Sequence, residues 1–429
     1  MQATPLEKLR VYLRGEYVGA LTSDSGTLSF AYDGAYCEKK DAPKLSVSLP
    51  IQKETFSHHA AAPFFSGLLP DGDVRKHLAK HLKLSPENIF GLLEAVGGDC
   101  AGAVSLYKEH DLLNNTTNPT YKVLSDTEAA EILSSLNHRP FLVGEEGIRM
   151  SGAGAQDKLM VSFVGKKIAL PTGQTPSTHI IKPPIKGAEN SVQNEFFCMR
   201  LAQKIGLPAP DTKILYVDQN PYYCVTRYDR ETNETGEVAR LHQEDFCQAL
   251  HIPPELKYEN DSGPSLEACF NLLDQRIRSG SMPGKDKLTF LYGVIFNVLI
   301  GNGDAHAKNF SILYRNGAET LAPFYDLLCT EIYNKNGKFR MAMKIDGHYM
   351  PHTMSARNWK NFAASIGIAP SLMHKALRKV INDVSREATG LYLDLHSDTG
   401  TTSPVYEKIM GVIASNTQEL ELQLLTWDT

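Results

Sequence analysis

The sequence contains no apolar run long enough to cross a membrane. Its longest, LTFLYGVIFNVLI at residues 288–300, has about 13 residues, whereas a membrane-spanning helix needs about 20. The opening segment, MQATPLEKLRVYL, also lacks the apolar core of a signal peptide. These absences predict a protein that works in the cytoplasm and has no membrane partner.

The 7 cysteines include no C-x-x-C pair, which argues against a zinc site or a disulfide framework and fits a reducing compartment. An excess of positive charge is also absent. The chain has 44 Lys and Arg against 49 Asp and Glu, a net charge of −5, so we expect no general attraction to nucleic acid. What remains is a chain of 429 residues, 42% apolar, which has the length for two or three globular domains.

The most informative stretch begins where the apolar run ends. Residues 288–300 predict a buried helix, and the Gly-Asn-Gly run at 301–303 breaks it and exposes Asp304 on a loop. Asn309 follows five positions later. A D-x4-N pair on its own more often caps turns than binds a ligand. Here the buried helix on one side and a predicted hairpin on the other favour a functional loop.

That hairpin is predicted from residues 310–314 and 321–325, two strand-like segments of which the second leads into Asp326. A carboxylate, an amide five residues later and a second carboxylate beyond a hairpin are the parts of a kinase-type phosphotransferase. Asp304 would accept the proton of the attacking hydroxyl. Asn309 and Asp326 would hold Mg²⁺ through oxygen atoms, the ligands that this hard cation prefers.

Two segments upstream could complete a nucleotide site. Residues 149–158, RMSGAGAQDK, form a loop whose small side chains would let backbone N–H groups approach phosphates, although a hairpin turn explains them equally well. Lys182 stands in an apolar strand predicted at 178–183, where an ammonium needs an anion. Glu195, in the first turn of a helix predicted at 191–207, could pair with it, as in kinases. A solvated edge strand and a helix-dipole interaction are the simpler alternatives.

A strand predicted at 222–227 ends in the run Arg-Tyr-Asp-Arg and leads into a crossover. Such a strand end can offer backbone N–H and C=O groups to the edge of an adenine, which makes Thr226, Arg227 and Tyr228 candidates for the base-binding segment. This prediction depends on the motifs on both sides of it.

The remaining pattern predicts an α/β (α+β) chain in three parts. Residues 1–110 read as strands, then helices, then a strand. The middle part, 126–228, carries the candidate phosphate loop and lysine, and 229–429 is mostly helical. Within this last part we expect a helix at 241–250 and a strand pair at 338–347.

Taken together and in order, these motifs resemble the HipA family, the kinase toxins of bacterial HipBA toxin–antitoxin modules. The resemblance runs nearly end to end and implies a two-lobed, protein-kinase-like fold with a β-rich N-terminal subdomain and a mostly helical C-terminal lobe. The segments that carry it are LSVSLP (45–50), FFSGLLPDGDVR (64–75), GGDCAGAVSL (97–106), RMSGAGAQDK (149–158), STHIIKPP (177–184), SVQNEFF (191–197), RYDR (227–230), KYENDSGP (257–264), GNGDAHAKNF (301–310) and PFYD (323–326).

The resemblance implies ATP- and Mg²⁺-dependent phosphorylation of a serine or threonine on a protein. The implied substrate is an aminoacyl-tRNA synthetase, glutamyl-tRNA synthetase in the best-known case, and its inhibition would slow translation and arrest growth. The implied partner is a HipB-like helix-turn-helix antitoxin. Some family members contact operator DNA through a late helix, but the comparable segment here, NFAASIGI at 361–368, has no Lys or Arg. We therefore expect DNA contact only through the antitoxin.

By position in these motifs, the resemblance implies that Asp304 is the catalytic residue and that Asn309 and Asp326 bind the metal. Ser151 matches the serine that the family autophosphorylates. The family member compared has an acidic residue where this chain has Thr226, so only a backbone contact is expected there. The implied ATP-binding residues are Ala153, Gly154, Ala155, Gln156, Asp157, Lys158, Lys182, Thr226, Arg227, Tyr228, His306, Ala307, Lys308, Asn309, Tyr325 and Asp326.

Two alternatives stay open at this point. A small-molecule kinase of the aminoglycoside or choline type would use the same catalytic residues, and the N-terminal part of the chain is what favours a protein substrate. The other alternative is a catalytically silent subunit that works only as a corepressor. The intact set of Asp304, Asn309 and Asp326 argues against it.

Overall fold

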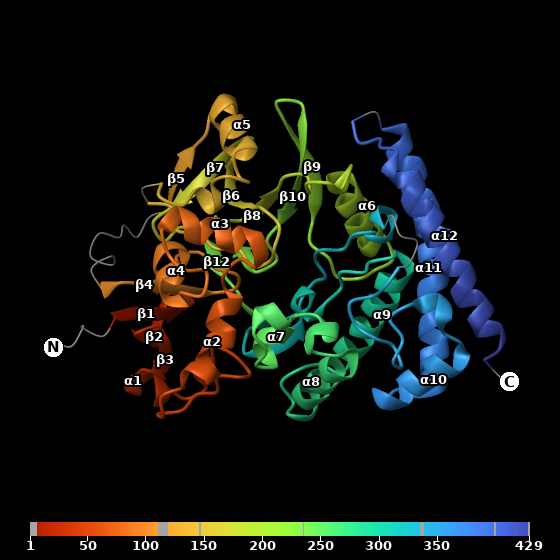
Figure 1. The fold of residues 1–429 in the computed structure, drawn as a ribbon, viewed down its shortest axis with the longest axis horizontal. Coiled ribbons are helices and arrows are strands. Elements are labelled where there is room, and N and C mark those ends of the chain that lie inside the picture. The colour runs from red at the N-terminus through yellow and green to blue at the C-terminus, as the bar shows by residue number, and fades with distance from the viewer. Residues whose placement is uncertain are drawn as a thin grey trace.

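The computed structural model describes residues 7–109, 119–145, 147–234, 236–334, 339–398 and 400–427. It is a mixed α/β structure, as predicted (Figure 1). The N-terminal strands and helices lie on the left of Figure 1 and the long C-terminal helices on the right. Among the described residues, no helix is both long and apolar enough to cross a membrane.

The N-terminal module, residues 7–107, packs helices against an antiparallel sheet. Its described elements are β1 (Glu7–Leu13), β2 (Glu16–Asp24), β3 (Thr27–Tyr32), α1 (Gly34–Cys37), α2 (His58–Gly67), α3 (Gly72–Leu82), α4 (Ile89–Val96) and β4 (Val104–Tyr107). The strand order is β3-β2-β1-β4. In β1, Leu9, Val11 and Leu13 are buried and alternate with more exposed residues, the period of two that turns one face of a strand toward a core.

A six-stranded antiparallel sheet follows, in the order β5-β7-β6-β8-β10-β9. Its strands are β5 (Thr120–Val123), β6 (Leu159–Val164), β7 (Lys167–Thr172), β8 (His179–Lys182), β9 (Thr212–Val217) and β10 (Asn220–Thr226), and the helices between them are α5 (Asp126–Ser134) and α6 (Ser191–Lys204). A capping box at Ser125 and Glu128 starts α5. The central strand β8 ends at Lys182, opposite Tyr223 of β10, so that lysine lies inside the sheet.

The rest of the chain is mostly helical, with two small sheets of order β11-β12 and β13-β14-β15. Its strands are β11 (Arg230–Thr232), β12 (Val238–Arg240), β13 (His242–Asp245), β14 (Ser311–Arg315) and β15 (Ala318–Leu321). Its helices are α7 (Phe246–Ala249), α8 (Leu266–Arg278), α9 (Lys285–Leu299), α10 (Ala356–Ser365), α11 (Pro370–Ser397) and α12 (Val405–Leu425). Short 3₁₀ turns lie at Pro140–Leu142, Pro254–Leu256, Glu259–Asp261, Ala307–Asn309, Glu331–Tyr333 and Pro351–Thr353.

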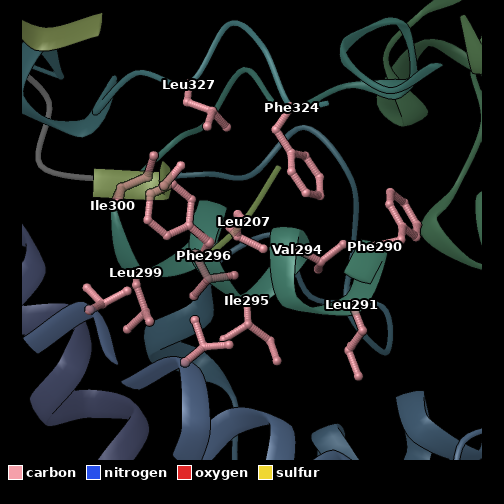
Figure 2. Close-up of a cluster of buried hydrophobic side chains, with 14 of the residues drawn as sticks. Leu207, Phe290, Leu291, Val294, Ile295, Phe296, Leu299, Ile300, Phe324 and Leu327 are labelled. Carbon is pink, nitrogen blue, oxygen red and sulfur yellow. The ribbon is translucent and has the colours of Figure 1, made fainter. Parts of the chain in front are cut away.

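The buried helix predicted at 288–300 is confirmed as α9, which lies at the centre of the largest hydrophobic cluster (Figure 2). Phe324 and Leu327 pack against it from the segment after β15. A side chain at Gly293 of α9 would overlap the ring of Phe324, so this glycine allows the segment to approach closely. The apolar core thereby fixes the backbone on both sides of Asp326.

The strand predicted at 321–325 is wrong. The hairpin partner of β14 is Ala318–Leu321, and the chain then leaves the sheet. The N–H of Phe324 donates instead to the carbonyl of Pro208, at 2.7 Å, and Asp326 itself has a φ of 53°, a left-handed conformation that is uncommon outside glycine. Packing of Phe324 on α9, rather than strand pairing, delivers Asp326.

Two further predictions of local structure are wrong. The helix expected at 241–250 begins as β13, which pairs with β14, and only Phe246–Ala249 is helical. Pairing between segments far apart in sequence outweighs local helix propensity here. Of the strand pair expected at 338–347, residue 338 lies outside the described residues, and 339–347 contributes one isolated bridge, between Ile345 and His348.

Candidate active site

One cleft, of about 1400 Å³, gathers almost all the residues singled out in the sequence. Its walls come from the N-terminal module, the six-stranded sheet and the segments around β14 and β15. Of the predicted residues, Ala307 does not line the cleft and is fully buried. Those that line it are Ser151, Ala153, Gly154, Ala155, Gln156, Asp157, Lys158, Lys182, Glu195, Thr226, Arg227, Tyr228, Asp304, His306, Lys308, Asn309, Tyr325 and Asp326.

Lys182 lies between two carboxylates. Its Nζ donates to Glu195 Oε1 at 2.7 Å and to Asp326 Oδ1. Glu195 reaches it from the second turn of α6, because that helix begins at Ser191 and has no acidic residue in its first turn, contrary to our expectation. Burial opposes the charge of Lys182, but Asp326 and Glu195 outweigh it and raise the lysine pKa above its ordinary value. The ammonium is thus retained inside the cleft.

The two carboxylates of this group differ in protonation. Burial raises the pKa of Glu195 to about 7, although the Lys182 ammonium acts in the opposite direction. For Asp326, burial is outweighed by Lys182 and Lys158, which lower its pKa to about 2. At neutral pH Asp326 is therefore ionised, as a metal-binding carboxylate must be.

The candidate phosphate loop wraps around a second buried lysine. Lys158 Nζ donates to the carbonyl of Ala153, and burial lowers the pKa of Lys158 to about 8. A Cβ added to Gly152 or Gly154 would come within 2.9 Å of the Lys158 side chain, and Gly154 has a φ of +100°. The small residues of this loop are therefore required by the lysine beneath it as well as by any phosphate above it.

The loop after α9 holds its polar residues through its own backbone. Asn302 Oδ1 accepts the N–H of Asp304 at 3.1 Å, and Asn309 Nδ2 donates to the carbonyl of Asp304 at 2.9 Å. Because the amide nitrogen of Asn309 is engaged in this way, its oxygen is the atom left for a cation. The carboxylate of Asp304 accepts a hydrogen bond from the hydroxyl of Tyr258 at 2.6 Å.

Asn309 and Asp326 fit a magnesium ion by the chemistry of their donor atoms, which are an amide oxygen and an ionised carboxylate in the same cleft. Among the described residues, no group of three or more His, Cys, Asp and Glu side chains could hold a metal without further ligands. Phosphate oxygens and water would supply the remaining ligands, as is usual for Mg²⁺ bound with a nucleotide.

In the candidate adenine-binding segment, Thr226, Arg227 and Tyr228 each make a different kind of contact. The N–H groups of Thr226 and Arg227 already donate to the carbonyls of Asp211 and Thr178, both at 2.9 Å. The Arg227 side chain turns away into a cluster of buried charges. Tyr228 stacks on Tyr325, with ring centroids 5.9 Å apart and planes inclined by 25°. The aromatic pair, rather than the arginine, offers a surface for a base.

The two remaining candidates of the catalytic loop are Lys308, which is paired within the protein, and His306, which is buried. Lys308 Nζ lies 3.1 Å from Asp245 Oδ2 and 3.9 Å from Asp71 Oδ1. Burial is outweighed by these two carboxylates, which raise the pKa of Lys308. Burial lowers the pKa of His306 to about 4, so its ring is neutral at pH 7.

Comparison with known proteins bears on this site. The HipA-like C-terminal domain family matches residues 150–388, which is more than half of the chain, and the HipA N-terminal domain family matches residues 9–107. The chain belongs to the HipA family. A Sinorhizobium fredii member named "Putative kinase Y4mE" is 39% identical over 415 residues, covering 94% of this chain and 97% of that protein.

Two comparisons with a characterised HipA agree with this assignment. The Shewanella oneidensis serine/threonine-protein kinase toxin HipA is 29% identical over 399 residues, which is 90% of each chain. The solved complex of Shewanella oneidensis HipA with HipB and operator DNA contains a chain that superposes with a TM-score of 0.79 at 25% identity, covering 97% of this chain and 96% of that one. The protein is accordingly a kinase with the HipA fold.

The sequence analysis missed several residues through which this HipA-family chain builds its cleft. Asp99 accepts hydrogen bonds from Ser177 Oγ at 2.6 Å and from Arg230 Nη2 at 2.7 Å. Asp71, Lys257 and Tyr258 adjoin the catalytic loop. These residues all lie in motifs that the sequence analysis quoted. The motifs alone do not indicate which segments of the chain come into contact, so the roles of these residues could not be predicted from them.

Proposed function

We propose that this chain is the toxin of a toxin–antitoxin pair and transfers the γ-phosphoryl group of ATP to a serine or threonine of a target protein. The observation that carries the proposal is the convergence of Lys182, Glu195, Asp304, Asn309 and Asp326 on one cleft. A lysine paired with a helix glutamate, a base on a loop and two oxygen ligands are the parts that protein kinases require. The name of the related Shewanella oneidensis toxin supports the protein-directed activity.

In this reaction each residue has one task. Asp304 orients the acceptor hydroxyl and takes its proton as the oxygen attacks. Lys182 binds phosphate oxygens and is held for that task by Glu195, 2.7 Å away. Asn309 and Asp326 would hold the metal, and bound Mg²⁺ would neutralise charge on the phosphates. Lys182 contacts Asp326 through Oδ1, so the carboxylate could hold the metal through its other oxygen.

We further propose that the target is an aminoacyl-tRNA synthetase, glutamyl-tRNA synthetase by family resemblance, and that the protein acts in the cytoplasm. A HipB-like helix-turn-helix antitoxin is the proposed partner, supported by the presence of HipB and operator DNA beside the related HipA chain. Residues 361–368, on and after α10, carry no Lys or Arg. The antitoxin would therefore make the DNA contacts.

Ser151 is the proposed site of autophosphorylation and self-inactivation. The residue is 1% exposed, and its Oγ donates to the carbonyl of Leu68 at 2.7 Å, while its N–H donates to the carbonyl of Asp99 at 3.0 Å. The hydroxyl can reach a catalytic base only after the loop leaves these contacts. A phosphate there adds nearly two negative charges, which this buried position cannot hold, so the loop would stay out and nucleotide binding would be lost.

The experiment that tests the proposal is phosphoproteomics after induced expression of the wild-type chain and of Asp326→Ala. We expect new phosphoserine or phosphothreonine on a synthetase, and phosphate on Ser151, with the wild type alone. Growth arrest should likewise disappear in Asp304→Asn. Transfer of label from ATP to aminoglycosides or choline but to no protein would identify a small-molecule kinase instead, and unchanged arrest by Asp304→Asn would identify a silent subunit.

A further inference from the structure

Lys308, the lysine of the catalytic loop, is paired with carboxylates of the protein and is not available to bind a phosphoryl group. Lys308 is 5% exposed and lies 3.1 Å from Asp245 and 3.9 Å from Asp71. Its ammonium is therefore neutralised inside the protein on the side of the cleft where Asp304 stands. Phosphoryl transfer needs positive charge at that place, since negative charge is spread over the transferring oxygens.

A second lysine lies beside the same loop and is held more weakly. Lys257 lines the cleft, and its Nζ is 3.4 Å from Asp71 Oδ2, a long contact for a charged pair. Both Lys257 and Lys308 lie close enough to His306 to help lower its pKa. Lys257 is thus near the catalytic loop, faces the cleft, and can leave Asp71 without breaking a short hydrogen bond.

The next residue touches the catalytic carboxylate directly. Tyr258 donates to Asp304 Oδ1 at 2.6 Å, and its ring meets that of His306 edge-on, with centroids 4.9 Å apart. The carboxylate is therefore fixed by one oxygen, which leaves Oδ2 for an incoming hydroxyl. Tyr258 does not itself line the cleft, so it holds the base from outside the lining of the cleft.

The segment that carries both side chains is anchored by hydrogen bonds at both of its ends. Gly263 closes it with a hydrogen bond from its N–H to the carbonyl of Tyr258 at 2.9 Å, and a Cβ added at Gly263 would lie 2.6 Å from that carbonyl oxygen. Glu259 ties the segment to the chain beyond the catalytic loop by accepting the N–H of Lys344 at 2.6 Å. Such anchoring is expected of a segment that presents reactive groups in fixed positions.

We infer that Lys257 and Tyr258 complete the transfer site. Lys257 is a catalytic residue whose ammonium leaves Asp71 and contacts the transferring phosphoryl oxygens, and Tyr258 is a positioning residue that holds Asp304. In the step they serve, a bond forms between the acceptor oxygen and the γ-phosphorus, the bond from that phosphorus to the leaving oxygen of ADP breaks, and the hydroxyl proton passes to Asp304. This inference rests on the proposed kinase function.

The test uses the full chain with ATP and Mg²⁺, and measures label transferred to purified glutamyl-tRNA synthetase and to the chain itself, with ATP affinity measured separately. We expect Lys257→Met to lower kcat about 10²–10³-fold while the affinity for ATP changes less than about threefold. Lys257→Arg should recover part of the rate, because it keeps the charge. Tyr258→Phe should lower kcat about tenfold, the scale of one lost hydrogen bond to a charged group, without changing KM for ATP.

Asp71→Asn is the matched control. If Lys257 served only to pair with Asp71, this variant would lose as much activity as Lys257→Met, and the inference would be overturned. We expect Asp71→Asn to lower the rate much less than Lys257→Met does, since it frees Lys257 and leaves Lys308 paired with Asp245. A wild-type chain that labels neither protein would refute the proposed function. An active wild type together with an equally active Lys257→Met would refute only the role given to Lys257.

Discussion

The molecule holds two clusters of buried charge, and their side chains are engaged in opposite ways. In the closed cluster, each carboxylate is shared among several arginines and backbone groups. In the open cluster, lysines and carboxylates face the cleft and can exchange partners. The closed cluster consists of Asp99, Arg227, Asp229, Arg230 and Arg240, and the open cluster consists of Lys158, Lys182, Glu195 and Asp326.

The protonation behaviour of the two clusters separates them. Burial alone would raise the pKa of Asp99, but Arg230, Arg227 and Arg240 outweigh it and hold that pKa well below its usual range. In the open cluster Lys182 and Asp326 hold each other in their charged forms in the same way, but burial moves Lys158 to a pKa of about 8 and Glu195 to about 7, both close to neutrality. Groups poised in this way mark functional sites more often than structural ones. The comparison teaches that buried charge serves stability in one cluster and chemistry in the other.

The largest effect on stability is expected from Asp99→Ala. Removing this carboxylate leaves three arginines facing one another without it and leaves the N–H and the hydroxyl of Ser177 without their acceptor. Breaking a buried ion pair by deleting one partner costs about 3–5 kcal/mol, and urea denaturation should record a loss of that size. Asp99→Asn keeps the shape of the side chain but not its charge, so its loss of unfolding free energy should lie between zero and that of Asp99→Ala. A loss below about 1 kcal/mol would show that the closed cluster does not hold the parts together.

The next largest effect is expected from Lys182→Met, and it should appear in activity. The substitution removes the ammonium that binds phosphate, which should lower the transfer rate about 10²–10³-fold. Stability should change by only about 1 kcal/mol, because Glu195 can take up a proton when its partner is lost. Lys213→Met, at an exposed lysine of β9, the edge strand of the same sheet, should leave the transfer rate unchanged and cost only the contact of its ammonium with the ring of Phe163, about 0.5–1 kcal/mol. A large loss of stability in Lys182→Met would show that the open cluster, like the closed one, stabilises the fold.

The difference between the clusters also explains how much could be predicted. Asp304 and Asn309 lie five residues apart behind a buried helix, so local pattern and family resemblance both reach them. Asp99 meets Ser177 and Arg240 across 78 and 141 residues of sequence, and nothing local indicates such pairs. Tyr258 likewise reaches Asp304 across 46 residues. The residues of the open cluster were predicted because kinase chemistry requires them. Of the closed cluster only Arg227 was a candidate, and it was expected to bind a base rather than to form ion pairs.

The fold shows the same limit. The helix at 288–300 follows from its own apolar residues and is present as α9. The wrong predictions at 241–250 and 321–325 fall where long-range contacts decide, namely the pairing of β13 with β14 and the packing of Phe324 on α9. Local sequence is enough to predict an element such as α9, whose own apolar residues form a buried helix. Where a segment depends on partners far away in sequence, those partners decide its structure.

The pH dependence of stability at Glu244, a buried carboxylate outside both clusters, would extend the comparison. Glu244 joins the N-terminal module to β13 by accepting the N–H of Val47 at 2.9 Å and the hydroxyls of Ser46 and Tyr314. Burial raises its pKa from 4.5 to about 7, so the folded protein binds the proton more tightly than the unfolded chain. The contribution of this group to stability therefore falls as pH rises through 4.5 to 7, the opposite sign from Asp99.

Glu244→Gln tests this sign because it cannot titrate. Between pH 5 and pH 8 the unfolding free energy of the wild type should fall relative to that of Glu244→Gln, by on the order of 2 kcal/mol. Urea denaturation at several pH values measures the difference. Parallel curves for the two proteins would mean that Glu244 is ionised throughout, as Asp99 is.

The smallest effect is expected from Glu231→Gln, next to Arg230 on β11. Glu231 pairs with Arg315, but the two side chains are 47% and 51% exposed. Solvent and salt screen such a pair, which contributes about 0–1 kcal/mol at most. Arg230→Met, one residue away and 2% exposed at its side chain, should cost several times more, since it leaves Asp99 and Asp229 short of a partner. Urea denaturation measures the loss of unfolding free energy in each variant. Equal losses would show that the closed cluster stabilises the fold through ion pairing as such, regardless of burial.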